Sequence, residues 1–75
     1  MTMGHIAAIG EPLRILGLAS AGVLLRPAEG PDAARDAWRD LPPDVDLVLL
    51  TPAAAGALGP EAVEGQEPLV AVMPP

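Results

Sequence analysis

Hydrophobic residues along the chain fall into short blocks that are separated by glycine, proline and charged residues. Four of these blocks have the length of a strand and show no regular polar alternation, a pattern typical of strands in a parallel sheet that is covered on both faces. The blocks are residues 5–9, 23–25, 45–50 and 69–73. We therefore predict four strands, of which the first, over residues 5–9, is expected to be buried on both faces.

Helical signals stand between the first three blocks. Pro12 suits the first turn of a helix, so residues 13–21 are predicted to form a helix that Gly22 ends. A second helix is predicted after Gly30, over residues 31–41, where apolar residues recur with helical spacing. The core-facing stripe of this second helix consists of Ala34, Ala37, Trp38 and Leu41.

The segment between the third and fourth blocks carries weaker signals. Thr51 followed by Pro52 is a common helix start, but Gly56 weakens the alanine-rich residues 53–58. We predict a short helix or turn there, and a flexible acidic loop over residues 60–67.

This alternation of strands and helices predicts a single α/β domain over residues 1–75. Right-handed crossovers leave two common strand orders, the Rossmann order and the flavodoxin-like order. We favour the second, a small four-stranded parallel sheet with strand order 2-1-3-4 and helices on both faces.

Composition narrows the classes of partner. The formal net charge is -6 and all four basic residues are arginines, so binding to nucleic acid is not expected. The chain has no cysteine, which fits a reducing, intracellular setting. Its longest apolar run, residues 15–25, is about half of the roughly 20 residues that cross a bilayer, so no direct membrane insertion is expected.

Ligands of parallel α/β sheets bind at the carboxyl ends of the strands, so the loops there are the places to look for chemistry. The loop at residues 10–12 has neither the glycine spacing of a dinucleotide site nor that of a phosphate-binding loop, and the chain has no lysine. A phospho-acceptor receiver site would need a carboxylate where Thr51 stands and an acidic pair where Glu11 stands alone. We predict no catalytic, cofactor or metal site.

Several isolated residues have a simpler structural interpretation. His5 lies at the start of the first strand, away from the ligand-binding end, and Ser20 lies in an apolar helix with no partner for catalysis. Trp38 could anchor a partner, but its place on the core-facing stripe favours packing. Arginines interrupt the acidic residues of the second helix and the loop after it, which predicts a solvated face: Asp32, Asp36, Asp40, Asp44 and Asp46.

The first helix is apolar almost all round, with Arg14 as its one charged residue. Only one side of it can face the sheet, so the other side is predicted to bind another protein chain or a second copy of this one. The predicted interface consists of Leu13, Arg14, Gly17, Leu18 and Ala21.

Five segments along the chain, taken in order, form a recognisable pattern. They are residues 6–10 (IAAIG), 16–22 (LGLASAG), 29–41, 46–51 (DLVLLT) and 67–74 (EPLVAVMP). In order and spacing they resemble the N-terminal domain of the F subunit of V-type and archaeal-type (V/A-type) rotary ATPases. That family has an Ile-Gly after the first hydrophobic run, glycines in the first helix, an acidic second helix, and an Ile-Thr that ends the third strand.

The chain also departs from the family pattern. Gly17 and Gly22 match, whereas Leu18 stands where the family favours Phe and Ser20 where it favours Leu. Members of the family continue into a C-terminal helical segment that engages the stalk and the catalytic head, and this chain ends at Pro75. The resemblance therefore implies a short form that docks on the stalk without reaching the head.

The implied role is that of a non-catalytic component of the central stalk, with the D subunit of the stalk as its chief partner and no cofactor. It would help to couple ATP hydrolysis or synthesis to proton or sodium transport, in the cytoplasm and peripheral to the membrane. Two other functions stay open: a free-standing, self-associating interaction domain that forms a homo-oligomer, and a degenerate small-ligand or nucleotide-binding domain.

Overall fold

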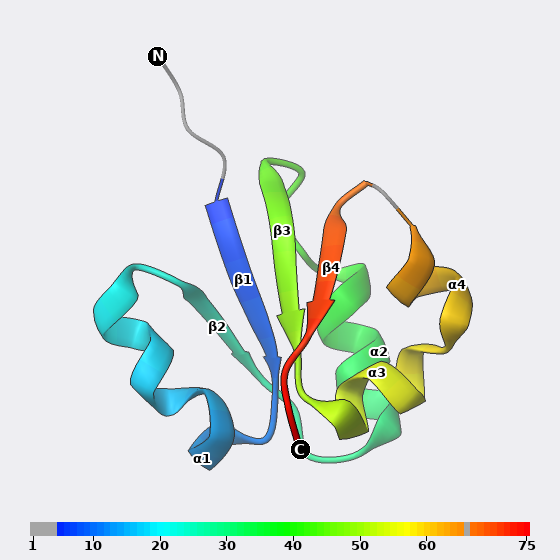
Figure 1. Ribbon diagram of the computed structural model, residues 1–75, viewed down its shortest axis with the longest axis horizontal. Coiled ribbons are helices and arrows are strands. Elements are labelled where there is room, and N and C mark those ends of the chain that lie inside the picture. Colours follow the sequence, from blue (N-terminus) through cyan, green and yellow to red (C-terminus); the bar gives the residue numbers. More distant parts are fainter. Residues whose placement is uncertain (1–4, 66) are drawn as a thin grey trace.

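The structure is a computed structural model that describes residues 5–65 and 67–75. Four parallel strands form one sheet with the order β2-β1-β3-β4 (Figure 1). This confirms the predicted α/β class and the flavodoxin-like strand order. The strands are β1 (His5–Gly10), β2 (Leu24–Pro27), β3 (Val45–Leu50) and β4 (Leu69–Val72).

Proline occupies the first turn of each α-helix in the described part of the chain. The missing N–H of proline costs nothing there, because the first N–H groups of a helix have no partner within it. The helical segments are α1 (Pro12–Ile15), the 3-10 helix η1 (Leu16–Ala21), α2 (Pro31–Arg39), α3 (Pro52–Leu58) and α4 (Pro60–Glu64).

The main core lies between the sheet and α2 and α3. Alternate residues of the two central strands point into it, among them Ile9 and Leu50, and Ala34 and Ala54 face them from the two helices. Trp38 packs half-buried against the same cluster, so its predicted role in packing is confirmed.

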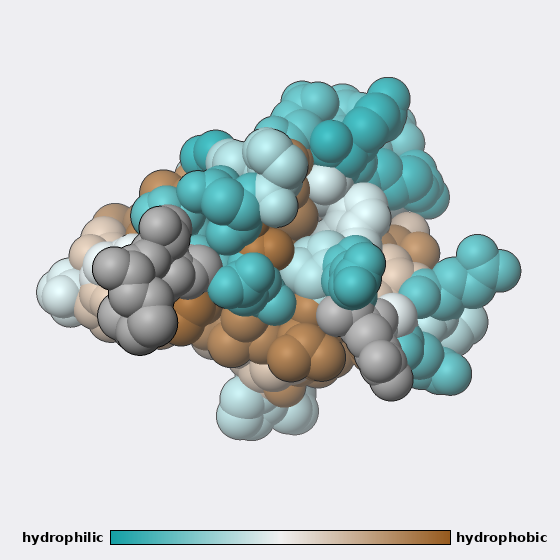
Figure 2. All heavy atoms as spheres, turned by 90° about the horizontal axis from the view of Figure 1, so that it is seen from above, coloured by the Kyte–Doolittle hydropathy of each residue, from teal (hydrophilic) through white to brown (hydrophobic). Residues whose placement is uncertain are grey.

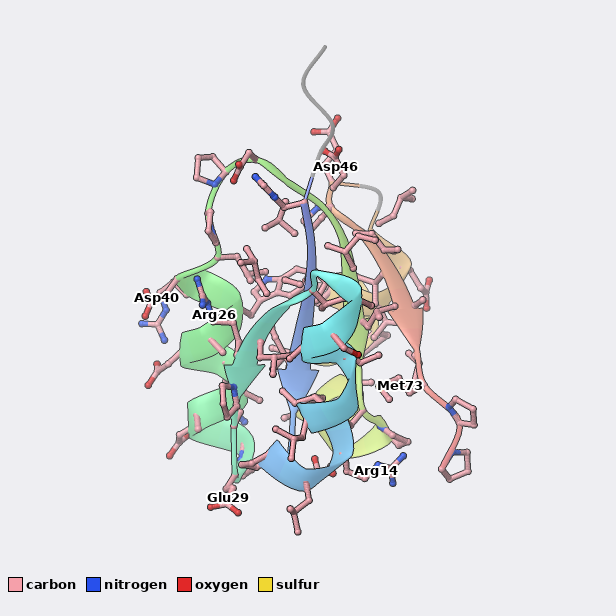
Figure 3. The ribbon with its side chains drawn as sticks, turned by 90° about the vertical axis from the view of Figure 1, so that its left-hand side faces the viewer. Arg14, Arg26, Glu29, Asp40, Asp46 and Met73 are labelled. Carbon is pink, nitrogen blue, oxygen red and sulfur yellow. The ribbon has the colours of Figure 1, made fainter. Side chains whose placement is uncertain are left out.

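The opposite side of the sheet is only partly covered. There α1 and η1 lie against β1 and β2, and Ala8 and Ile15 are completely buried. Figure 3 looks from the β2 side and shows α2 on one side of the sheet and α1 with η1 on the other. The prediction that the first strand is buried on both faces is wrong at Ile6, which is 40% exposed. On the same side of the sheet, Leu69 of β4 is 55% exposed.

The first helix differs from the prediction. Residues 13–21 were expected to be one helix, but only the first turn is α-helical and the chain continues as η1. Glycine and serine are poorer α-helix formers than alanine or leucine, and the side chain of Ser20 donates a hydrogen bond to the carbonyl of Gly17 at 3.1 Å. Leu16, the first residue of η1, is 62% exposed, whereas Ile15 before it is buried.

The acidic loop predicted over residues 60–67 is also wrong in part, because α4 forms there. Gly59 ends α3 with a positive φ of 87°, and Pro60 then begins the new helix. Gln66 lies outside the described residues. The second strand is shifted from the predicted 23–25 to Leu24–Pro27.

Candidate functional site

The carboxyl ends of β1 and β3 lie side by side at the centre of the sheet, where ligands of such folds bind. Thr51 follows β3 there and is completely buried. Its Oγ1 donates a hydrogen bond to Oε1 of Glu11 at 2.9 Å and accepts one from the backbone N–H of Ala54 at 3.3 Å. Thr51 therefore caps α3, as predicted, and also fixes the carboxylate that follows β1.

Gly10 leaves the space in which Thr51 sits. A Cβ atom added to Gly10 would overlap Cγ2 of Thr51 and would lie 2.6 Å from its Oγ1. Only glycine fits at this point without a shift of the backbone or of the threonine side chain. The last residue of β1 and the first residue after β3 thus form one tightly packed unit, which we call the Gly10–Thr51 contact.

Next to this contact lies a small cavity of about 120 Å³. Pockets for small organic ligands usually measure about 300–1,000 Å³, and one water molecule takes about 30 Å³. The cavity therefore has room for a few water molecules, and the carboxylate of Glu11 opposes the entry of a phosphate group. Its walls are Glu11, Ala28, Gly30, Pro31, Ala34, Ala53 and Ala54.

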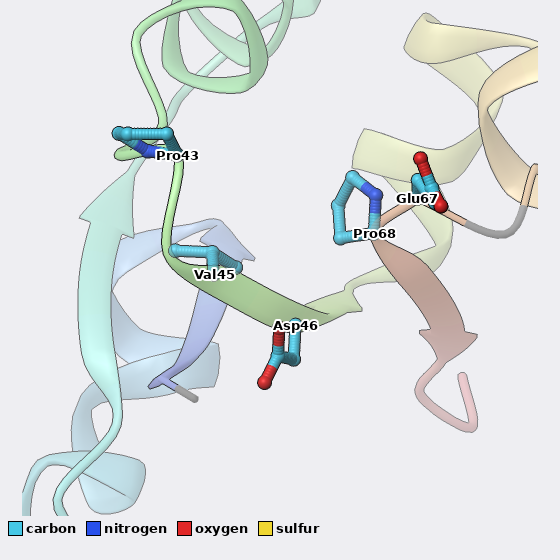
Figure 4. A pocket seen from close by; sticks show the side chains of 5 residues that line it. All are labelled: Pro43, Val45, Asp46, Glu67 and Pro68. Atoms are coloured by element: carbon cyan, nitrogen blue, oxygen red, sulfur yellow. The ribbon is translucent and has the colours of Figure 1, made fainter. Parts of the chain in front are cut away.

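A larger hollow of about 420 Å³ lies at the opposite, amino end of the sheet. Two carboxylates stand at its walls, Asp46 on β3 and Glu67 just before β4, together with Pro43, Val45 and Pro68. Figure 4 shows the two carboxylates pointing in different directions rather than toward one another. Sequence reasoning missed this hollow because residues distant along the chain form it.

The interface predicted on the first helix is largely open to solvent. Leu13 is 89% exposed, Gly17 and Ala21 are exposed, and Leu18 is half-buried. Arg14 is exposed and its Nη2 donates a hydrogen bond to the carbonyl of Pro74 at 2.7 Å. These residues lie together on α1 and η1, and their role in binding stays a prediction.

The isolated polar residues lie away from the carboxyl ends of the strands or on exposed helix faces. Nε2 of His5 is 2.9 Å from Oδ2 of Asp44 at the amino end of the sheet. On α2, ion pairs form between Asp32 and Arg35 at 2.7 Å and between Asp36 and Arg39 at 2.6 Å. Both pairs are exposed, so each contributes little to stability.

Metal-binding clusters and membrane-spanning helices are absent from the part of the chain that the structure describes. In residues 5–65 and 67–75, no three acidic or histidine side chains are grouped so that they could hold a metal ion. No helix within these same ranges is long and apolar enough to cross a membrane.

A surface that the sequence analysis did not single out lies on the uncovered side of β3 and β4. Figure 2 shows hydrophobic atoms gathered along the lower side of the molecule, which is the front of the sheet in Figure 1. The strand order indicates this uncovered surface. Right-handed crossovers in this order put one connection on one face and two on the other, so four strands receive a single helical connection on one side.

Comparisons of the chain with protein-family models, with curated proteins and with solved structures gave no significant match.

Proposed function

We propose that this chain is a non-catalytic central-stalk component of a V/A-type rotary ATPase, equivalent to the F subunit. In that role it binds the D subunit of the stalk and turns with it, and it helps to couple ATP hydrolysis or synthesis to proton or sodium transport. The proposal rests on the resemblance of the sequence segments to that family and on the way in which those segments pack.

The observation that carries the proposal is the Gly10–Thr51 contact. The Ile-Gly that ends β1 and the Thr that follows β3 are two separate parts of the resemblance, and they lie against each other at the centre of the fold. A motif pair that serves to close the carboxyl edge of the sheet is a structural signature. This is the kind of motif that a protein acting through its surfaces, rather than through a reactive site, would carry.

The exposed side of α1 and η1 supports the same proposal. Leu13 is 89% exposed and Leu16 is 62% exposed beside it, more than any other large hydrophobic residue in the described part of the chain. Apolar side chains that are held out to solvent on a short helical segment suit burial against another protein. We assign this surface to the D subunit.

Co-purification tests the proposal. The chain is co-expressed with the D subunit of the same organism, and the complex is recovered through a tag on the D subunit. We expect the two proteins to be recovered together in equal amounts. If the chain folds but stays in the flow-through, the stalk assignment is wrong.

A pair of matched variants locates the interface. Leu13→Gln and Leu69→Gln each replace an exposed leucine by a polar residue of similar size, and neither residue is in the core. We expect Leu13→Gln to weaken the affinity for the D subunit about tenfold, as the loss of one buried leucine side chain implies, and so to lower the recovery. Leu69→Gln should leave recovery unchanged. Equal effects of the two variants would contradict the assignment to α1 and η1.

A further inference from the structure

Half of one sheet face is apolar and has no helix over it. Strand register places the residues of this open face side by side: Ile6 on β1 pairs with Leu47 and Leu47 with Leu69, while Leu49 pairs with Ala71. The residues that alternate with them, Ala7, Val48, Leu50 and Val70, belong to the main core on the other side or pack against it. We call this surface the open face, and it consists of Ile6, Leu47, Leu49, Leu69 and Ala71.

The open face is accessible along its whole length. Ile6, Leu69 and Ala71 are exposed, and Leu47 and Leu49 are both half-buried. The α1 and η1 segments cover β1 and β2 and stop short of β3 and β4, as Figure 1 shows. A contiguous apolar patch of this kind on a small protein usually marks a site of interaction.

Charges of opposite sign stand at the two ends of the open face. Asp46 and Glu67 are exposed at its amino end, just where β3 and β4 begin. Arg14 lies at its carboxyl end, where its hydrogen bond to Pro74 places the guanidinium beside the end of β4. Figure 3 shows Asp46 and Arg14 at opposite ends of the sheet.

We propose that the open face binds an amphipathic helix of a partner protein, laid antiparallel to β3 and β4. Its apolar stripe would cover the open face. Acidic residues in its first turn would face Arg14, and basic residues in its last turn would face Asp46 and Glu67. Helices commonly carry this charge bias, because it complements their own dipole, so one orientation satisfies both ends at once.

The length of β3 and β4 fits such a helix. β3 and β4 are six and four residues long, which corresponds to about 13–20 Å at a rise of about 3.3 Å per residue. A helix of roughly 9–13 residues spans that length at about 1.5 Å per residue. A helix placed there, next to η1, completes the second layer that α/β sheets require to bury both faces.

A second copy of the chain is a poorer occupant. The five side chains of the open face are too few to supply the ~800 Å² per partner that stable dimers bury. The chain also carries a net charge of -6, so two copies repel each other. The inference of a helix rests on the sheet and on the charges at its two ends, and it holds whether or not the chain is a stalk component.

A designed peptide tests the proposal directly. The probe is a blocked peptide of about 16 residues, long enough to be partly helical, with Leu and Ala on one face, Glu in the first turn and Lys in the last. Its control has the same composition with the Glu and Lys positions exchanged. We expect the first peptide to shift the amide NMR signals of Ile6, Leu49 and Ala71, and the control to bind about tenfold more weakly.

Matched variants and the oligomeric state complete the test. Leu69→Gln should weaken peptide binding about tenfold and Leu13→Gln should not change it, the reverse of the pattern expected for the D subunit. Shifts on α1 and η1 with none on β3 and β4, equal binding of both peptides, or no binding at millimolar peptide would overturn the proposal. So would sedimentation showing a dimer that Leu69→Gln dissociates, since a second copy would then be the occupant.

Discussion

At the scale of single residues, the Gly10–Thr51 contact is the most constrained point of the molecule. Thr51 is completely buried and its hydroxyl makes two hydrogen bonds, one to Glu11 and one from the first turn of α3. Gly10 provides the space for that side chain. One contact therefore joins β1, β3 and α3, and substitutions there should be felt by the whole domain.

Gly10→Ala should destabilise the fold by about 3 kcal/mol, because the new methyl group overlaps a buried side chain. The free energy of unfolding in urea measures this loss. Thr51→Ala removes Cγ2 and Oγ1, the two closest atoms, so the double variant Gly10→Ala/Thr51→Ala should be more stable than the sum of the single effects implies. Strict additivity would show that the two residues are not coupled.

Thr51→Val keeps the shape of the side chain and loses both hydrogen bonds. We expect a loss of about 1–2 kcal/mol, the usual cost of removing a helix cap and leaving a buried N–H without its partner. Thr51→Ser retains the hydroxyl and serves as the control, with a smaller loss from the missing methyl group. If the Val and Ser variants unfold at the same urea concentration, the hydroxyl does not stabilise the fold.

At the scale of elements, the chain changes direction where glycine or proline permits it. Gly22 ends η1 in the left-handed region with φ of 79°, and its N–H bonds to the carbonyl of Ala19 at 3.2 Å. Gly17 lies within the same segment without a positive φ and with open space around it. The backbone conformation at Gly22 thus favours glycine, whereas neither the conformation nor the space at Gly17 requires it.

Gly22→Ala should cost about 1 kcal/mol, because a side chain disfavours the left-handed conformation that ends η1. Gly17→Ala meets no neighbouring atom within 4 Å and should change stability by less than ~1 kcal/mol, in the stabilising direction. Thermal unfolding of the two variants gives the comparison. Equal losses of stability in the two variants would contradict the left-handed conformation of Gly22 at the end of η1.

Much of the element order could be predicted from the sequence because the signals are local. The block at residues 45–50 became β3 without change, and Thr51 with Pro52 began α3 as expected. The exceptions lie where glycine or proline stands inside or next to a predicted element. The helix predicted over residues 13–21 changes to 3-10 geometry at Leu16, which is exposed, and α4 forms in a segment whose acidic composition suggested a loop.

The candidate site was likewise predicted only in part. The residues at the carboxyl edge, Glu11 and Thr51, stood out because strand ends can be located from the sequence. The open face did not, since the strand blocks show no regular alternation of polar and apolar residues and give no sign of which side is covered. The number of helical connections on each face decides that, and it becomes visible only when the strand order is known.

At the scale of the whole molecule, two apolar surfaces remain open. One is the outer side of α1 and η1, around Leu13, and the other is the open face, around Leu69. Leu13 lies on α1 and Leu69 on β4, so the two surfaces can be altered separately at these residues, while Arg14 of α1 borders both. On this account the chain acts through these two surfaces, the first with the D subunit and the second with an amphipathic helix, while the packed sheet keeps them in fixed positions.

The mass of the species formed with the D subunit tests the central claim most directly. Light scattering on an equimolar mixture of the two purified proteins separates a complex from its components. The account predicts one species whose mass is the sum of one copy of each protein. Two species that elute with their separate masses, at concentrations where both proteins are folded, would contradict it.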